Sequence, residues 1–386
     1  MKKTVLAVLL LISFSLNLSA GEWYLGDSGC SAFLPEGWTI FSREDRDRIS
    51  FISPEGDVIY QVSVYPGDLY ASDTLMMEDH LAGLTILEAD QSQFLYRGRS
   101  CSLADLTLDS EGIPVRGWFL FIDREDYDYY LTAITSPDNY ERALPLILSC
   151  LDGFSPDEES RKQPGAVSTL IRSAGGSDRR DVLEFPLGAL EYTWNDVTEE
   201  AGRLLIEREA AILSGYNTPE VFDEAWKRYY QLIYRNSAGD LDDLARQLER
   251  VLSDLDDTEK AKILLQWLQD FEYGSTDRFS DLMTSTESLL ARTGDCDSLA
   301  IIYITLLNKM GVPSLLMVSR EFSHAMAAVA VPAEGAGFSF ENQRFVVAEM
   351  TKNVALGQIA AEMADISKWV IIPFEGYNQG QLALGE

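Results

Sequence analysis

The sequence Leu290-Ala291-Arg292-Thr293-Gly294-Asp295-Cys296-Asp297-Ser298-Leu299-Ala300 opens a long apolar segment that continues to Met310. Apolar residues occupy nearly every side of a helix drawn over this segment, which is typical of a helix buried on all sides. Gly311 can end the helix, and Pro313 prevents its continuation. The pattern predicts a buried central helix, from Leu299 to Met310, with Cys296 in its first turn.

The position of this cysteine has chemical consequences. A helix N-terminus stabilises negative charge, and the thiolate is the nucleophilic form of cysteine. Unpaired N–H groups of the first helical turn can also stabilise an oxyanion on a substrate. Asp295 and Asp297 oppose the first effect because they repel a thiolate. Cys296 therefore needs a cationic partner.

The chain contains two histidines, His80 and His324. His324 follows Cys296 by 28 residues (324 − 296 = 28) and lies in the segment Phe322–Val331. The small residues of this segment predict a strand with room beside an imidazole, and Ser314–Ser319 predicts the strand before it. His80 lies in the other half of the chain, where the pattern favours a surface residue.

Glu349 lies in the segment Phe345–Thr351, which predicts the next strand, and it follows His324 by 25 residues (349 − 324 = 25). On adjacent antiparallel strands, its carboxylate can accept the second ring N–H of His324. That contact would fix the tautomer and stabilise the imidazolium. Cys296, His324 and Glu349 are therefore the candidate catalytic residues.

Four motifs in this region resemble the transglutaminase-like superfamily: TGDCDSLA at 293–300, GVPSLLM at 311–317, HAMAAV at 324–329 and VVAEMT at 346–351. Members of that superfamily place Cys at a helix start, His on the following strand and Asp on the strand after it. The resemblance covers residues 255–372. It implies a papain/transglutaminase-like domain in which a helical segment precedes an antiparallel sheet.

The resemblance also implies roles for the three residues. Cys296 would be the nucleophile, His324 the base and then the acid, and Glu349 the orienting acid. Glu349 departs from the usual Asp, which keeps the charge but lengthens the arm. The implied reaction passes through a thioester at Cys296 on a peptide or protein substrate and needs no metal or organic cofactor. Hydrolysis by a peptidase or amidase is preferred over acyl transfer to an amine; Gln266 and Trp267 are candidate oxyanion donors.

Two other interpretations of the same residues stay open. The domain could be a non-catalytic module of the cell envelope that binds a peptide or protein. Alternatively, Cys296 could form a disulfide with a cysteine of the N-terminal half. Metal binding by the acids around Cys296 is disfavoured because only one histidine lies nearby.

The N-terminus has the layout of a secretory signal peptide. Lys2 and Lys3 precede an apolar run, Val5–Phe14, and the small residues Leu18-Ser19-Ala20 follow. The apolar run is too short to cross about 30 Å of hydrocarbon comfortably. We therefore expect cleavage after residue 20, a secreted or periplasmic location, and no transmembrane segment in the mature chain.

Composition limits the partners of the chain. Its 386 residues suggest about two domains, and 46% hydrophobic residues are enough to form real cores. The net charge is −31 and becomes −33 without Lys2 and Lys3. Such acidity argues against nucleic acid and anionic lipid as partners. The sequence does not predict the oligomeric state.

The first half predicts an α+β domain over residues 21–155. Its antiparallel sheet with flanking helices includes a hairpin formed by Ile49–Ser53 and Val58–Tyr65. Helices are predicted at Leu75–Leu87 and Asn139–Leu151. The FLPEGW opening at 33–38 and the closing helix faintly resemble the PsbP-like fold.

A polar linker is predicted over residues 156–190, and the transglutaminase-like domain over 191–386 with its core at 255–372. This second domain is expected to begin with helices. Their predicted positions are Asn195 or Asp196 to Ser214, Thr218 to Arg235, Asp240 to Leu255, and Asp257 or Thr258 to Phe271.

The remaining cysteines, Cys30, Cys101 and Cys150, all lie in the first half. Export makes a disulfide permissible, so one pair among them could be bridged. The sequence does not choose among the three pairings, and each pairing leaves one cysteine over.

Overall fold

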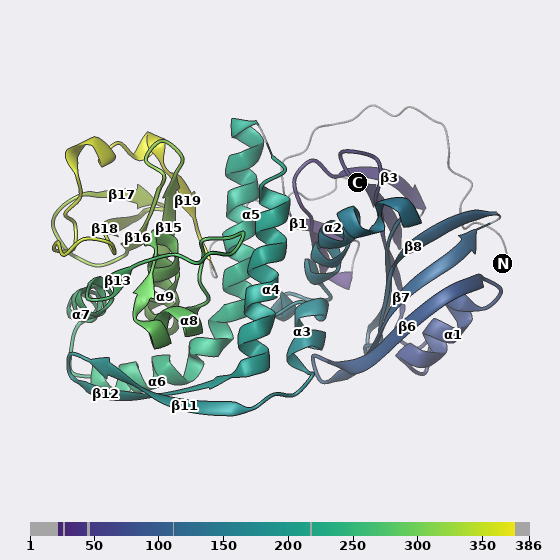
Figure 1. Cartoon of the computed structure of the whole chain (residues 1–386), viewed down its shortest axis with the longest axis horizontal. Coiled ribbons are helices and arrows are strands. Elements are labelled where there is room, and N and C mark those ends of the chain that lie inside the picture. The colour runs from purple at the N-terminus through teal and green to yellow at the C-terminus, as the bar shows by residue number, and fades with distance from the viewer. Residues whose placement is uncertain (1–21, 26–27, 45–46, 111, 217, 375–386) are drawn as a thin grey trace. The chain divides into compact units, whose positions relative to one another are not determined.

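A computed structural model describes residues 22–25, 28–44, 47–110, 112–216 and 218–374 (Figure 1). The expected signal peptide lies outside these residues. The chain divides into two units. Of the described residues, 22–173 and 212–228 belong to the first unit, and 174–211 and 229–374 belong to the second. None of the described helices is both long enough and apolar enough to cross a membrane.

The first unit contains a seven-stranded antiparallel sheet in the order β3-β4-β5-β9-β8-β7-β6. Its strands are β3 (Thr39–Glu44), β4 (Arg48–Ile52), β5 (Ile59–Pro66), β6 (Thr85–Tyr96), β7 (Arg99–Ser110), β8 (Ile113–Ile122) and β9 (Tyr127–Thr135). The predicted hairpin is confirmed as the antiparallel pair β4–β5. A smaller sheet contains β1 (Glu22–Leu25), β2 (Cys30–Phe33) and β10 (Phe154–Ser155).

Helices pack on the large sheet through two separate apolar clusters. The helices of this part are α1 (Asp73–Leu81), η2 (Pro137–Asn139), α2 (Tyr140–Asp152), η3 (Glu159–Lys162) and α3 (Ala166–Arg172). From α2, Ile147 and Leu151 join a cluster with Phe51 of β4, whereas Met76 of α1 packs with Phe119 of β8 in the other cluster. The unit therefore has the predicted α+β arrangement.

The predicted helix at Leu75–Leu87 is wrong in its second half. Helix α1 ends at Leu81, and Gly83 follows with a φ of 84°. That left-handed conformation suits glycine and ends the helical path. Thr85 already pairs with Asp109 of β7, so sheet hydrogen bonds prevail over the helical pattern there.

The segment expected to be a linker, 156–190, contains η3, α3 and the strand β11 (Asp178–Phe185). Its polar residues serve as hydrogen-bond partners. Ser168 of α3 donates its N–H and its hydroxyl to the Asp152 carboxylate, at 2.9 and 2.5 Å. Strand β11 pairs with β12 (Gly188–Asn195) as a two-stranded antiparallel ribbon.

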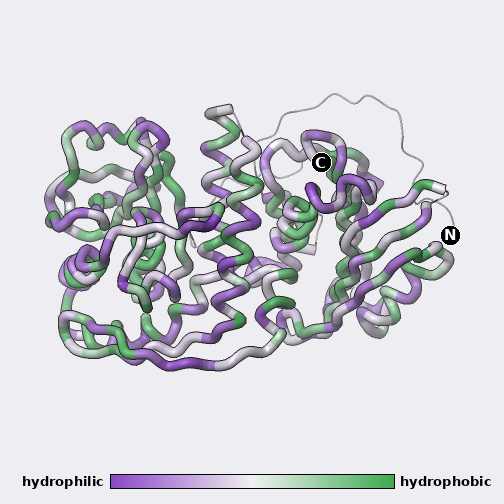
Figure 2. Tube along the Cα trace, in the orientation of Figure 1, coloured by the Kyte–Doolittle hydropathy of each residue, from purple (hydrophilic) through white to green (hydrophobic). Residues whose placement is uncertain are grey.

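The helices that follow are α4 (Asp196–Leu213), α5 (Pro219–Ser237), η4 (Ala238–Leu241), α6 (Asp242–Val251), α7 (Asp257–Gln269), α8 (Ser285–Ala291) and α9 (Cys296–Lys309). Helix α7 is capped by Asp256, one residue before the predicted caps, in a reciprocal capping box with Glu259. Helix α9 is buried from Ser298 to Leu307, as the apolar pattern predicted. Figure 2 shows α9 as mostly hydrophobic and β11 as largely hydrophilic.

The second unit also contains a five-stranded antiparallel sheet in the order β17-β18-β16-β15-β19. Its strands are β15 (Ser314–Ser319), β16 (His324–Val329), β17 (Gly337–Phe340), β18 (Gln343–Ala348) and β19 (Val370–Ile372). Helix α9 packs against β15 and β16. Two short strands, β13 (Glu272–Tyr273) and β14 (Thr293–Gly294), pair in parallel just before α9.

Candidate active site

Cys296 is the first residue of α9. The residue before it, Asp295, has an extended backbone, and its carboxylate accepts the N–H of Ser298 at 3.0 Å. This N-cap begins the helix at Cys296. The sulfur therefore lies at the amino end of a helix whose remaining turns are buried, as the sequence predicted.

The backbone N–H groups of Asp297 and of Ala325 in β16 favour the thiolate and act to lower the pKa of the Cys296 thiol. The pKa is nevertheless raised to about 12, because burial and the Asp297 carboxylate outweigh these N–H groups, and Asp295 adds to the rise. The repulsion expected from the two aspartates is thus present. Cys296 is a neutral thiol at neutral pH, and a base is needed to remove its proton.

Asp295 and Asp297 form an acidic pair, and Asp297 accepts a hydrogen bond from a tyrosine. The buried hydroxyl of Tyr230 donates to Asp297 Oδ2 at 2.7 Å. Burial and the neighbouring carboxyl of Asp297 raise the pKa of Asp295. Across the described residues, no three His, Cys, Asp or Glu side chains gather as metal ligands.

His324 and Glu349 form a direct hydrogen bond, with 2.7 Å between Nε2 and Oε2. The side chains are only 14% and 7% exposed, so water screens the pair weakly. His324 begins β16 and Glu349 directly follows β18, its antiparallel neighbour. Burial alone would raise the pKa of Glu349, but the hydrogen bonds from His324 and Thr351 outweigh it and lower the pKa.

The three predicted residues therefore lie on adjoining elements of the second unit. His324 contacts Glu349 directly, and its strand, β16, packs against α9, which begins at Cys296. Because Nε2 faces Glu349, Nδ1 is the ring nitrogen left for another partner.

Three further residues contact this group, and the sequence analysis missed them. Thr351 donates both its N–H and its hydroxyl to Glu349 Oε1, each at 2.7 Å. Gln269, at the end of α7, donates to the carbonyl oxygen of Glu349 at 2.8 Å. The buried indole of Trp369 lies edge-on to His324, with 6.4 Å between ring centroids.

The two residues predicted as oxyanion donors, Gln266 and Trp267, have surroundings different from those the prediction requires. Trp267 is buried, and its indole N–H donates to the carbonyl oxygen of Glu184 at 2.7 Å. Gln266 is exposed on α7. The next turn of the same helix carries Gln269, the glutamine that does contact the candidate site. The helical spacing from Gln266 could have indicated Gln269 as a candidate. No sequence pattern indicated that Gln269 would contact Glu349.

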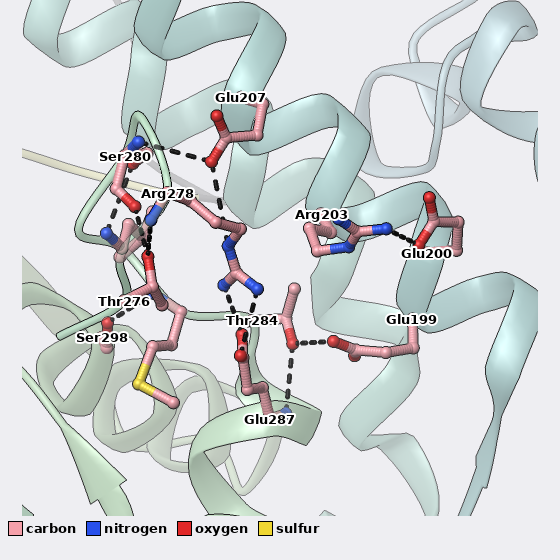
Figure 3. A network of polar contacts seen from close by, with 12 residues as sticks. Glu199, Glu200, Arg203, Glu207, Thr276, Arg278, Ser280, Thr284, Glu287 and Ser298 are labelled. Atoms are coloured by element: carbon pink, nitrogen blue, oxygen red, sulfur yellow. Dashed lines mark hydrogen bonds and ion pairs between the residues drawn. The ribbon is translucent and has the colours of Figure 1, made fainter.

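A network of polar contacts holds the loop between β13 and α8 (Figure 3). Arg278 donates to both carboxylate oxygens of Glu287 in α8, at 3.1 and 2.5 Å. Its Nε lies 3.8 Å from Glu207 of α4. At the end of the loop, Met283 donates its N–H to the hydroxyl of Ser298 in the first turn of α9, at 2.9 Å. The loop is thereby tied to the start of the helix that carries Cys296.

The other histidine and the other cysteines have no comparable arrangement. His80 is half-buried rather than on the open surface, because its ring nitrogens face the Met76 carbonyl (2.9 Å) and the Tyr65 hydroxyl (3.0 Å). Burial lowers its pKa. None of the four cysteines forms a disulfide, so the structure contains none of those left open above, and the other three cysteines are buried. These buried cysteines are Cys30, Cys101 and Cys150.

Neither a protein-family model nor a curated protein matches the chain. The chain is similar to CyanoP, a cyanobacterial PsbP from Synechocystis sp. PCC 6803, with 11% identity, a TM-score of 0.29, and coverage of 38% of this chain and 98% of that chain. It is also similar to LpqN of Mycobacterium tuberculosis, which is involved in cell envelope biogenesis, at 13% identity and a TM-score of 0.28 over 35% of this chain and 88% of that chain.

A third similar structure is a candidate cysteine protease from Cytophaga hutchinsonii. It is 11% identical, with a TM-score of 0.24, over 85% of this chain and 83% of that chain. All three likenesses are distant. Function must therefore be inferred from the site residues of this chain.

Proposed function

We propose that the chain is an exported, transglutaminase-like cysteine enzyme that hydrolyses or transfers acyl groups at peptide or amide bonds. In this proposal Cys296 is the nucleophile, His324 the base and then the acid, and Glu349 the orienting acid. One observation carries it. The strand on which His324 hydrogen-bonds Glu349 at 2.7 Å packs against α9, the helix that begins at Cys296.

The first chemical step forms the bond between sulfur and the substrate carbonyl carbon. His324 Nδ1 takes the thiol proton as the bond forms, because Nε2 is already bound to Glu349. Glu349 then stabilises the imidazolium. The carbonyl oxygen becomes negative, and the N–H of Cys296, at the first position of α9, has no acceptor within the helix and can stabilise that charge.

The second step breaks the bond between the carbonyl carbon and the leaving nitrogen. The imidazolium returns its proton to that nitrogen, an amine leaves, and a thioester remains on Cys296. Water then attacks the thioester with His324 as base, which releases a carboxylic acid and restores the thiol. An amine attacking instead would produce a new amide. We favour water as the acceptor.

The test is labelling with iodoacetamide, followed by peptide mass spectrometry. We expect Cys296 to be modified selectively, and the rate to fall at least tenfold in His324→Ala. Cys296→Ala is the control for labelling elsewhere, since the other three cysteines are buried. An equal rate of Cys296 labelling in the wild-type protein and in His324→Ala would contradict the enzyme. It would favour the non-catalytic binding module instead.

Hydrolysis and acyl transfer are separated by a second assay. A mixed set of unfolded protein substrates is incubated with the protein in the presence and absence of a fluorescent primary amine. Hydrolysis releases new carboxyl or amino termini in both samples and leaves the substrates unlabelled. Covalent incorporation of the amine, lost in Cys296→Ala, would show that transfer prevails.

The exported location is tested through the N-terminus. We expect the mature protein, recovered from the culture medium or the periplasm, to begin at Gly21. Recovery of the full-length chain from the cytoplasm would overturn the proposed location and leave the chemistry of the site unaffected.

A further inference from the structure

The carboxylate of Glu349 is held at both oxygens. Oε2 accepts from His324, and Oε1 accepts from the N–H and the hydroxyl of Thr351, each at 2.7 Å. The carboxylate is only 7% exposed, so these protein groups take the place of most of its hydration. Apart from the half-turn that exchanges its two equivalent oxygens, a large rotation of the carboxylate would break at least one of the three hydrogen bonds.

The main chain of Glu349 is held as well. Gln269 Nε2 donates to the carbonyl oxygens of Glu349 and Val354, at 2.8 and 2.9 Å. An amide nitrogen supplies two donors, and two carbonyl oxygens accept them here. The segment from Glu349 to Val354 is thereby fixed to the C-terminal end of α7.

A glutamate needs this restraint more than an aspartate does. Its side chain has one more rotatable bond, so an unrestrained carboxylate would point toward the imidazole for a smaller part of the time. Because catalytic geometry depends on a well-oriented base, groups that hold the orienting acid contribute to rate without touching substrate.

We propose that Thr351 is a positioning residue that, through its hydroxyl and its N–H, aims Glu349 Oε2 at His324 Nε2, and that Gln269 supports it by holding the main chain of Glu349. The inference rests on the proposed function of the three site residues. Its direct consequence is that neutral His324 carries its proton on Nε2, which leaves the Nδ1 lone pair for the thiol of Cys296.

The test compares Thr351→Val with Thr351→Ser. Valine has nearly the same shape as threonine but lacks the hydroxyl donor, whereas serine retains that donor. The readout is the NMR spectrum of the full chain labelled with isotopes at histidine. The chain contains only two histidines, so only two imidazole rings contribute signals. His80 belongs to the first unit and supplies a reference signal.

In the wild-type protein we expect a downfield Nε2–H resonance from His324, protected from exchange with water. In Thr351→Val this resonance should move upfield and exchange faster, and Thr351→Ser should restore it. The iodoacetamide rate at Cys296 should fall about fivefold to tenfold in Thr351→Val, which is the effect of one hydrogen bond, and stay within about twofold in Thr351→Ser.

The two proposals fail in different ways. If Cys296 labelling does not depend on His324, the proposed function fails, while the histidine spectra still decide the role of Thr351. If labelling depends on His324 but Thr351→Val retains both the protected resonance and the rate, Thr351 is not a positioning residue. Gln269→Leu, which removes both donors to the main chain, is the second variant. It should shift the same resonance even if Thr351→Val fails to fold.

Discussion

At the scale of single residues, the protonation of Cys296 determines how the site can react. Two aspartates flank the sulfur, and burial adds to their effect. The resting sulfur is therefore a thiol rather than a preformed thiolate. Proton transfer and attack on the carbonyl should occur together once a substrate is bound.

The first prediction concerns this raised pKa. Because the pKa of about 12 lies above the assay range, the thiolate fraction of Cys296 should grow with pH throughout that range. We expect the alkylation rate to rise about tenfold per pH unit between about pH 7 and 9. Asp297→Asn removes one repulsive charge but retains an acceptor for Tyr230. It should speed alkylation at pH 8 about threefold to tenfold.

Asp243→Asn is the matched control, because Asp243 is an exposed carboxylate on α6. Its alkylation rate should match that of the wild-type protein. A rate that stays constant from pH 6 to 9 would show a stable thiolate at Cys296 and would contradict the prediction.

The second prediction concerns Asp128, whose side chain is buried in β9 with no hydrogen-bond partner for Oδ2. Burial raises its pKa to about 6. A raised carboxyl pKa means that the folded protein binds the proton more tightly, so stability is lost as the pH rises from about 4 to 6. Asp128→Asn should stabilise the first unit by about 1–2 kcal/mol at pH 7 and have little effect at pH 4.

Scanning calorimetry at both pH values measures this difference. The exposed Asp126 supplies the control, and Asp126→Asn should change the unfolding temperature little at either pH. If Asp128→Asn is less stable than the wild-type protein at pH 7, the Asp128 carboxylate has a stabilising partner and the prediction is wrong.

At the scale of the elements, the apolar and alternating patterns predicted much of the second unit. Helix α9 and the strands β15 and β16 lie close to where the sequence placed them, because nearly all their residues are buried and local and tertiary preferences agree. Strand β18 begins at Gln343 and ends at Ala348, so it begins and ends before the predicted segment Phe345–Thr351. The ribbon β11–β12 was missed. It is two-stranded, and charged residues interrupt its apolar pattern, so little in its sequence separates it from a polar linker.

The third prediction concerns the loop between β13 and α8. Arg278→Ala removes a two-point ion pair with Glu287 that is largely shielded from water. We expect faster hydrogen exchange, measured by mass spectrometry, in peptides covering 274–291 and slower alkylation of Cys296. The cost in stability should be about 1–2 kcal/mol.

Arg203→Ala is the matched control in the same network (Figure 3). Arg203 pairs with Glu200, three residues earlier on α4, and pairs of this kind contribute about 0.5 kcal/mol or less. Equal exchange in the two variants would mean that the Arg278 ion pair does not hold the loop.

At the scale of the whole molecule, the fourth prediction is a count of thiols. None of the four cysteines is in a disulfide, and only Cys296 is not fully buried. An aromatic disulfide reagent should therefore titrate one thiol in the native protein and four after denaturation without reductant. Two thiols after denaturation would show that one disulfide forms after export, and none in the native protein would mean that Cys296 is blocked.

The sequence could predict the α+β class and the three candidate residues because both follow from local patterns and chain order. It could not predict Thr351 and Gln269 as neighbours of Glu349. A threonine two residues after a glutamate has no local signature, and Gln269 reaches that glutamate only after α7 packs beside the sheet. The roles of Cys296, His324 and Glu349 stay predictions until the labelling experiment is done.

The antiparallel register that pairs Ala327 with Ala348 has a consequence for engineering the chain. A slip of two residues would displace Glu349 by roughly 7 Å, which would separate acid from imidazole. The Glu341–Asn342 turn between β17 and β18 lies outside that ladder. An affinity tag grafted into the turn should therefore preserve reactivity, whereas a single residue inserted within β16 or β18 should abolish it.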